Sequence, residues 1–403
     1  MPEVQKYLCI LSFAKLSLLE LYELQVSGIL HFQILASSEN SVLIQCDTET
    51  AKHLATRGGG IYKIGSVCGN SPETLSSCLP LPESSKFNWT VSGYECNPHV
   101  FEEAKNTVSQ ILKDASLGKS RFIRPDSSAE ETELKITDLL RNVLIDEEGK
   151  RVRGLDVIVD CSLDEVCYGY TQFTSNLESF RERDFGRPYQ DPTVTLSPRL
   201  ARILVNLCGL QRGKTLLDPF CGLGTIPQEA LLLGYNTVGM EISSSVVTRC
   251  RENLDWLRNR FQVSPKLSSK ILRGNAFNLE PSVLPRVDAI ASEPILLSKL
   301  ERNPSSEKAE EMIRAASEKY RLAFRAFSSI LRPEGKVSIV APELIDDHGK
   351  PHGIGIEILA AELGFVLDHP TDSHVENPCS VSTTKRKIIR RKVYLFRRHS
   401  RAA

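Results

Sequence analysis

Residues Asp218 to Thr225, with the sequence DPFCGLGT, combine an acidic side chain with two glycines that are one residue apart. They follow a strand-like run at 215–217 and precede a helical pattern at 226–233, and glycine lets a chain turn sharply at such a junction. A helix that begins there presents unpaired backbone N–H groups to a ligand. The segment therefore predicts a ligand-binding loop, with candidate contacts at Asp218, Phe220, Gly222, Gly224 and Thr225.

A second acidic residue, Glu241, ends the next strand-like run at 237–240. A carboxylate at this strand end can accept hydrogen bonds from both ribose hydroxyls, although it could also simply cap the following helix. The loop matches neither the dinucleotide pattern G-x-G-x-x-G nor the phosphate loop. Its acidic first residue also disfavours a phosphate and favours a ligand that carries a cation. These features favour S-adenosylmethionine over NAD or ATP as the cofactor.

The loop resembles motif I of class I methyltransferases, in the form found in those that modify exocyclic amines of nucleic-acid bases. Three nearby stretches, RDFGRP at 183–188, LSPRLAR at 196–202 and QEA at 228–230, are similar to the tRNA guanosine-10 N2-methyltransferase family. The resemblance covers most of the chain and is specific over 183–241. It implies S-adenosylmethionine as cofactor, tRNA as partner and transfer to N2 of a guanosine near position 10. Eukaryotic relatives work with a small activator subunit, so such a partner is also considered.

The same resemblance assigns the methionine end of the cofactor to the loop and its ribose to Glu241. Asn275 and Ala276 follow a strand-like run at 270–273 and would lie by the adenine, although Asn275 also fits an ordinary turn. The other residues expected to contact the cofactor are Leu196, Ser197 and Ile242. No metal is expected.

The catalytic motif of the amine methyltransferases is [DNS]-P-P-[FYW], and this chain has Ser292-Glu293-Pro294-Ile295 in its place. The motif must orient the amine through polar acceptors and hold a flipped base by stacking. Ser292, Glu293 and Pro294 are therefore the candidate catalytic residues. Because Ile295 replaces the aromatic residue, stacking worth ~1–3 kcal/mol per base has to come from elsewhere.

This departure from the motif leaves several hypotheses open. In one, Glu293 orients the amine and the protein is an active methyltransferase. In another, the fold is vestigial and the protein binds tRNA without catalysis. Glu293 itself could also simply be a solvent-facing loop carboxylate. A methyltransferase that acts on another RNA or on DNA is the third hypothesis.

Composition places the chain among ordinary globular proteins: 403 residues, 41% hydrophobic and 25% charged. Lys plus Arg and Asp plus Glu both number 50, so any surface that binds nucleic acid must be a local one. Candidates are the basic stretch 385–401 and a cluster of Lys113, Lys119, Arg121 and Arg124. The 11 scattered cysteines fit free thiols in a cytoplasmic protein, and no apolar run approaches the ~18 residues of a membrane span.

Strand-like runs alternate with helical patterns after residue 195, which favours a doubly wound, mostly parallel sheet. The resemblance makes this the Rossmann-like class I methyltransferase fold of seven strands, and we expect the last strand, 388–396, to be antiparallel. The N-terminal region mixes short strands and helices and is α+β. The expected domains are an N-terminal module (1–62), a THUMP-like RNA-binding domain (63–172), a linker (173–194) and the methyltransferase domain (195–403).

Overall fold

The computed structural model describes residues 3–81, 87–117, 119–124, 154–191, 196–279, 284–294, 297, 300–369, 379–381 and 388–399. The chain forms two compact units: Met1–Leu18 with Leu30–Ser179, and Leu19–Ile29 with Phe180–Ala403. The expectations for Ile295 and for the basic residues at 385–387 and 401 lie outside the described residues. Within the described ranges, no helix has both the length and the apolar character needed to cross a membrane.

The first unit is built on one sheet, with eight strands in its described part, in the order β2-β3-β1-β4-β8-β7-β5-β6. These strands are β1 (Val4–Leu11), β2 (Gln33–Ser37), β3 (Ser41–Asp47), β4 (Ile61–Gly69), β5 (Asn88–Tyr94), β6 (Arg121–Phe122), β7 (Leu155–Asp160) and β8 (Cys167–Thr174). Neighbours pair antiparallel, except that β5 pairs parallel with β6 and β7. Because β4 pairs with both β1 and β8, the sheet continues through the two N-terminal modules expected from the sequence. The boundary between those modules and the THUMP-like character stay predictions.

The helices that accompany this sheet are α2 (Thr48–Arg57), α3 (Leu75–Cys78) and α4 (Pro98–Asp114), whereas α1 (Lys15–Val26) belongs to the second unit from Leu19 onward. The long helix α4 was not expected, although its start carries a clear signal. Asn97 caps it by accepting a hydrogen bond from the Val100 N–H at 3.0 Å, and Pro98 occupies the first helical position. Its apolar face, which includes Val108 and Leu112, packs into the core of the first unit.

Two of the scattered cysteines form a disulfide, Cys68 in β4 and Cys78 in α3, with Cα atoms 5.6 Å apart. The expectation of free thiols is wrong for this pair. A short 3-10 turn (Pro72–Thr74) and α3 follow β4 directly and contact it, which brings the two cysteines together. The spacing of the two cysteines in the sequence does not by itself indicate that the chain turns back onto β4 after this strand.

The second unit contains a sheet whose main path is β11-β10-β9-β12-β13-β17-β15. Its strands are β9 (Thr215–Asp218), β10 (Asn236–Glu241), β11 (Ser269–Arg273), β12 (Val287–Ser292), β13 (Leu331–Ile345), β15 (Phe365–Leu367) and β17 (Ile389–Arg398). The first five strands of the path are parallel, and β17 is antiparallel to both β13 and β15. The path starts with the doubly wound order 3-2-1-4-5, so the mostly parallel sheet and its antiparallel last strand are confirmed.

The strand count differs slightly from the expected seven. The main path has seven strands, but two short strands, β14 (Pro351–Gly353) and β16 (Cys379–Val381), pair with β13 and β17. The described part of the sheet therefore has nine strands. Both additions lie beside the antiparallel end of the sheet and leave the carboxyl ends of β9 and β10 unchanged.

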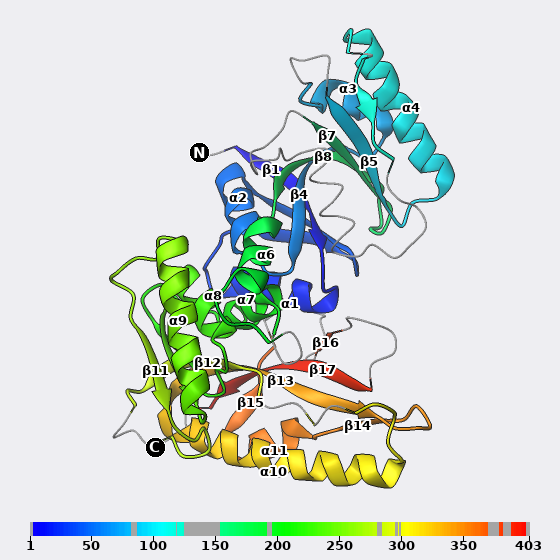
Figure 1. Ribbon diagram of the computed structural model, residues 1–403. Helices are drawn as coiled ribbons and strands as arrows, with labels where there is room; N and C mark the ends of the chain where they lie inside the picture. The colour runs from blue at the N-terminus through cyan, green and yellow to red at the C-terminus, as the bar shows by residue number, and fades with distance from the viewer. Residues whose placement is uncertain are drawn as a thin grey trace. The chain divides into compact units, whose positions relative to one another are not determined.

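Helices cover both faces of this sheet, as Figure 1 shows. One face carries α7 (Pro198–Asn206), α8 (Thr225–Leu232) and α9 (Ser244–Arg260), and the other carries α10 (Ser306–Ile330) and α11 (Ile356–Glu362). The expected cap of α7 is confirmed, because the Ser197 hydroxyl accepts a hydrogen bond from the Leu200 N–H at 3.3 Å. The alternation of strand and helix thus gives the layered arrangement that the sequence predicts.

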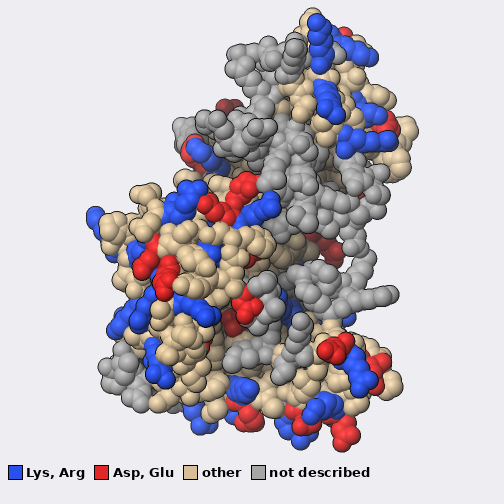
Figure 2. Space-filling model, in the orientation of Figure 1, with Lys and Arg blue, Asp and Glu red and all other residues tan. Residues whose placement is uncertain are grey.

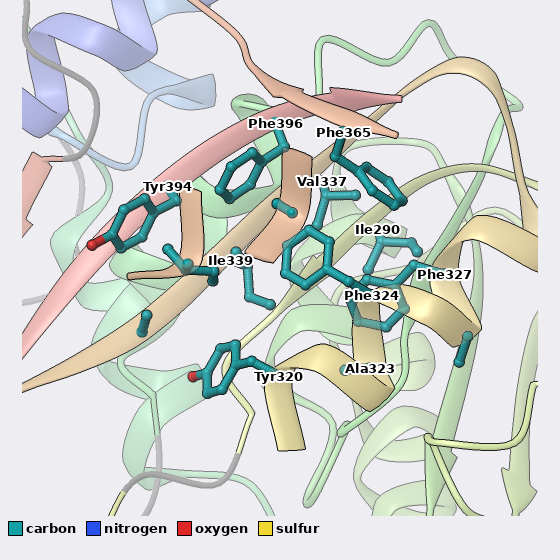
Figure 3. Close-up of a cluster of buried hydrophobic side chains, with 14 of the residues drawn as sticks. Ile290, Tyr320, Ala323, Phe324, Phe327, Val337, Ile339, Phe365, Tyr394 and Phe396 are labelled. Carbon is teal, nitrogen blue, oxygen red and sulfur yellow. The ribbon is translucent and has the colours of Figure 1, made fainter. Parts of the chain in front are cut away.

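The core between the sheet and α10 is rich in aromatic side chains (Figure 3). Phe324 of α10 lies edge-on to Phe365 and Phe396, with ring centroids 5.1 and 5.3 Å apart. Tyr320, one turn earlier, donates a hydrogen bond to the Val340 carbonyl at 2.7 Å. These contacts fix α10 against β13 and β17, and so fix the carboxyl end of the sheet where the candidate site lies.

Candidate active site at the carboxyl ends of β9, β10 and β12

Asp218, the last residue of β9, lies directly beneath the glycine loop and is 2% exposed. Its Oδ1 accepts hydrogen bonds from the Phe220 N–H at 3.2 Å and from the Ser292 hydroxyl at 2.7 Å. Burial raises the pKa of Asp218 to about 7, although both hydrogen bonds favour the charged form. A carboxyl group in this state can become fully negative when a cationic ligand binds beside it.

The two loop glycines adopt left-handed backbone conformations, with φ of +48° at Gly222 and +92° at Gly224. A Cβ atom on Gly224 would lie 2.7 Å from the Cys250 Sγ of α9, which is closer than packed atoms allow. At Gly222 a Cβ would meet nothing within 4 Å, because this residue faces a cavity. Both Gly222 and Gly224 are therefore needed for the backbone conformation of the loop, and Gly224 is also needed because a side chain there would collide with α9.

The cavity has a volume of about 350 Å³ and lies where β9, β10 and β12 end. Of the expected cofactor contacts, those that line it are Leu196, Asp218, Phe220, Gly222, Thr225 and Glu241. The candidate catalytic residue Glu293 also lines it. The structure thus brings together side chains that are up to about a hundred residues apart in the chain.

Glu241 ends β10 and accepts a hydrogen bond from the Ser243 N–H at 2.9 Å. The other expected contacts do not line the cavity: Ser197, Gly224, Ile242, Asn275 and Ala276. Ser197 and Gly224 precede the first residues of α7 and α8, where the Ser197 hydroxyl caps α7, and the Ile242 side chain is 65% exposed. Asn275 accepts a hydrogen bond from the Phe277 N–H at 3.0 Å, as a turn residue does. Contacts of Asn275 and Ala276 with an adenine stay predictions.

The candidate linker supplies part of the wall, which the sequence did not predict. Tyr189, Gln190 and Asp191 line the cavity, and the Arg187 guanidinium donates a 2.8 Å hydrogen bond to the Thr225 hydroxyl. A helix, α6 (Leu177–Phe185), occupies the preceding residues. The RDFGRP stretch carries the family resemblance and so indicated a role near the site, but its polar composition also fits an exposed linker. In the structure this segment packs onto the glycine loop.

The three candidate catalytic residues occupy different surroundings. Ser292 is fully buried, its hydroxyl is bonded to Asp218, and it lines no described cavity, so in the structure it holds Asp218 in place. Pro294 lines a second, mostly apolar cavity of about 220 Å³, which shares Phe220 with the first. Phe220, Phe277 and Tyr320 contribute aromatic surface to this second cavity. The aromatic surface beside Pro294 thus comes from other elements.

Glu293 is paired with Arg391 of β17. The Arg391 Nε donates to Oε1 at 2.5 Å and its Nη2 donates to Oε2 at 3.3 Å. The Glu293 side chain is 9% exposed. Burial raises the pKa of Glu293 above its ordinary value, and the guanidinium offsets part of that shift. Glu293 is therefore an oriented, partnered carboxyl group and not a solvent-facing one.

The basic C-terminal stretch is largely neutralised where the structure describes it. Besides Arg391, Lys392 pairs with Glu343 at 2.7 Å, and Arg397 pairs with Asp368 at 3.3 Å. The Val393–Phe396 side chains are buried in the sheet. The stretch thus serves mainly as a sheet strand with paired charges. In the first unit the basic cluster is exposed at all four positions, Lys113, Lys119, Arg121 and Arg124, and Figure 2 shows basic surface along α4.

Residues 186–321 match the family model described as the RMKL-like methyltransferase domain of UPF0020. This stretch of the second unit is a methyltransferase domain. Its match spans the glycine loop, Glu241 and Glu293, which are the residues that meet at the cavity. The methyl donor of such a domain is S-adenosylmethionine, and the chain is accordingly an S-adenosylmethionine-dependent methyltransferase.

The chain is also similar to curated methyltransferases. Over 329 residues it is 26% identical to the tRNA (guanine(10)-N2)-dimethyltransferase of Methanothermobacter thermautotrophicus, which covers 81% of this chain and 85% of the relative. The protein of the same name from Methanocaldococcus jannaschii is 33% identical over 135 residues, 31% of this chain and 37% of that relative. These similarities support the family resemblance seen in the motifs.

Among solved structures, TrmN from Thermus thermophilus aligns with a TM-score of 0.54 over 98% of this chain and 100% of that chain, at 17% identity. A possible methylase from Clostridium difficile aligns with a TM-score of 0.53 over 100% of this chain and 99% of that one, at 12% identity. At such identities the likeness concerns the fold. It confirms the Rossmann-like class I methyltransferase fold for the second unit.

The cavity residues fit this cofactor chemically. Asp218 and Glu241 offer carboxylates to a ligand that carries cationic groups and ribose hydroxyls, and Gly222 leaves the space that a side chain would fill. The cofactor, when bound, supplies an electrophilic methyl group. The residues of this chain that would hold it are the lining set around the glycine loop, and Glu293 stands at the side of β12 where an acceptor amine is expected.

Proposed function

We propose that the protein methylates the exocyclic N2 of a guanosine in tRNA, at or near position 10. The observation that supports this most directly is the position of Glu293, which lines the cofactor cavity and takes the place of the first proline of the amine-methylating motif. The similarity to one tRNA (guanine(10)-N2)-dimethyltransferase over 81% of the chain supports tRNA as the substrate class.

In this proposal, each residue has a defined task. The Asp218 and Glu241 carboxylates bind the cofactor, and Ser292 holds Asp218 through its 2.7 Å hydrogen bond. Glu293 accepts a hydrogen bond from the acceptor amine and so fixes the direction of its lone pair. Phe220, shared by the two cavities, offers an aromatic face beside Pro294 for the flipped base. The exposed basic cluster of the first unit contacts tRNA phosphates.

Mass spectrometry of tRNA nucleosides from cells with and without the protein tests the proposal. We expect N2-methylguanosine or N2,N2-dimethylguanosine at position 10 only where the protein is present. Cells keep any activator subunit available, so the result does not depend on reconstituting one. Restoration of the modification by the wild-type chain, but not by an Asp218→Ala chain, would assign it to this site.

The outcome that would contradict the proposal is an unchanged tRNA modification profile. If the purified protein then bound S-adenosylmethionine in calorimetry and also bound tRNA, it would be a tRNA-binding protein with a vestigial methyltransferase fold. If the modification profile of ribosomal RNA or DNA changed and that of tRNA did not, the protein would be a methyltransferase with a different nucleic-acid substrate.

A further inference from the structure

The carboxyl edge of the second sheet carries an ion pair that the amine-methylating motif does not include. Glu293 follows β12, whereas Arg391 belongs to β17, and β13 lies between these two strands. Arg391 is opposite Pro342 in the antiparallel register, three residues beyond Ile339, which pairs with Ser292. The pair therefore reaches across β13 and depends on the long connection that returns the last strand to the sheet.

The pair keeps hydrogen-bonding capacity after its own two contacts. A carboxylate has about four lone-pair sites, and the two hydrogen bonds from Arg391, at 2.5 and 3.3 Å, use one on each oxygen. A guanidinium has five N–H groups, of which these contacts use two. Glu293 lines the cofactor cavity, and 23% of the Arg391 side chain is exposed. Arg391 lines neither of the two described cavities, but its partly exposed guanidinium places donors directly beside the carboxylate that does line one.

Guanine has the complementary pattern on its Watson–Crick edge, where the N2 and N1 donors are followed by the O6 acceptor. We propose that Glu293 and Arg391 read this edge together, Glu293 accepting from N1–H and N2–H and Arg391 donating to O6. The inference rests on the proposed function and adds the basis of its base specificity. Adenine also carries an exocyclic amine, but its N1 is an acceptor that would face the carboxylate, so the pair would exclude it.

The same arrangement explains why a charged residue can replace the first proline of the motif. A carboxylate alone, buried at this position, would lose its charge or destabilise the site. The Arg391 fork supplies the counter-charge and fixes the plane of the carboxyl group. Arg391 is thus a specificity residue that acts on the base and a positioning residue that acts on Glu293.

The experiment measures methyl transfer by the full chain to tRNA that carries either guanosine or 6-thioguanosine at the target position. The thio analogue keeps N1–H and the N2 amine but replaces O6 with sulfur, a weaker acceptor. We expect the wild-type kcat/KM for guanosine to exceed that for the analogue by about tenfold, the value of one charge-assisted hydrogen bond. Arg391→Met should lower transfer to guanosine and remove this preference, and Arg391→Lys should keep part of it.

Arg390→Met is the matched control, because Arg390 is the adjacent residue of β17 and pairs with Glu343 at 3.7 Å. It should leave the preference for guanosine unchanged. The ratio of the two substrates separates recognition from general damage, since a misfolded or merely destabilised variant loses activity on both equally. Calorimetric binding of S-adenosylhomocysteine establishes that each variant retains its cofactor cavity.

Two results would overturn the inference in different ways. If Arg391→Met lowers transfer to both substrates by the same factor, Arg391 is structural and the guanine-reading role is wrong, while the proposed function stands. If the wild-type chain methylates neither substrate and the tRNA of cells with and without the protein has the same modification profile, the proposed function fails and the inference fails with it.

Discussion

At the scale of single residues, the decisive feature is the shared environment of Asp218, Ser292 and Glu293 at one strand edge. Asp218 is buried beside two other carboxylates, Glu293 and Glu241, which both raise its pKa further, and the Ser292 hydroxyl stabilises the charged form. Burial raises the pKa of this carboxyl group to about 7, so a bound cation favours its ionised form. The properties of the site should therefore depend on pH in the physiological range.

The affinity for S-adenosylmethionine should rise with pH. The pKa of Asp218 in the free protein is about 7, so the carboxyl is mostly protonated at pH 6 and mostly ionised at pH 8. A cationic ligand binds the ionised form better, and affinity should increase about tenfold over this interval. Calorimetry at both pH values measures it. An Asp218→Asn variant should bind more weakly and without this pH dependence; an equal dependence in the variant would assign the titration to another group.

Gly224→Ala should destabilise the protein more than Gly349→Ala. Both glycines have positive φ, +92° and +81°, so each substitution costs roughly 1–2 kcal/mol in backbone strain. Only the Gly224 methyl would collide with Cys250, at 2.7 Å, whereas nothing lies within 4 Å at Gly349. Overpacking adds about 1–3 kcal/mol at Gly224. Urea unfolding compares the two variants, and equal losses would show that the loop relaxes around the methyl group.

At the scale of elements, a buried carboxylate joins three helices behind the loop. Glu229 of α8 is fully buried and pairs with Arg183 of α6 at 2.5 Å and with Arg202 of α7 at 2.6 Å. All three residues lie in the motifs that carry the family resemblance: RDFGRP, LSPRLAR and QEA. The motif residues therefore include ones that hold the helices together and do not touch the cavity.

Glu229→Gln should cost about 3–5 kcal/mol of unfolding free energy, because it removes the buried carboxylate that pairs with two buried guanidinium groups. The control is Glu182→Gln, which removes an ion pair with Arg260 whose side chains are 33% and 58% exposed. An exposed pair contributes at most about 1 kcal/mol. Denaturant unfolding distinguishes the two, and a loss of similar size in both variants would contradict the structural role of Glu229.

At the scale of the whole molecule, the acidic and basic residues are equal in number but unevenly distributed. In the second unit, basic residues of β17 form ion pairs with acidic residues of the same unit. Lys392 and Arg397 have acidic partners, while the basic cluster of the first unit is exposed. The N-terminal region therefore has a local basic surface although the formal net charge of the whole chain is zero. Long-range attraction of tRNA should come chiefly from that region.

Replacing Lys113, Lys119, Arg121 and Arg124 with Gln should weaken tRNA binding and reduce its salt dependence. Each lost phosphate contact lowers the slope of log K against log salt by about 0.7–0.9. Lys308→Gln serves as control, because Lys308 is exposed but pairs with Glu311 at 2.7 Å. Filter binding over a range of salt concentrations gives the slopes. An unchanged slope in the fourfold variant would place the phosphate contacts elsewhere.

The sequence alone predicted the elements of the second unit, because their signals are local. The cap at Ser197, the alternation of strands and helices and the loop from Asp218 to Gly224 each depend on neighbouring residues, and each is confirmed. The positions of Asp218, Glu241 and Glu293 at one cavity also followed, since parallel strands end at one edge of a sheet.

Only the tertiary structure decided which partners these residues have. Arg391 meets Glu293 across 98 residues, and Glu23 of α1 pairs with Lys336 of β13 across 313. The pairing of Cys68 with Cys78 and the contribution of Tyr189 to the cavity wall are likewise results of packing. The physical reason is that a side chain's charge and exposure depend on neighbours that chain folding brings from distant segments, whereas helix caps, turns and strand periodicity depend on the adjacent backbone.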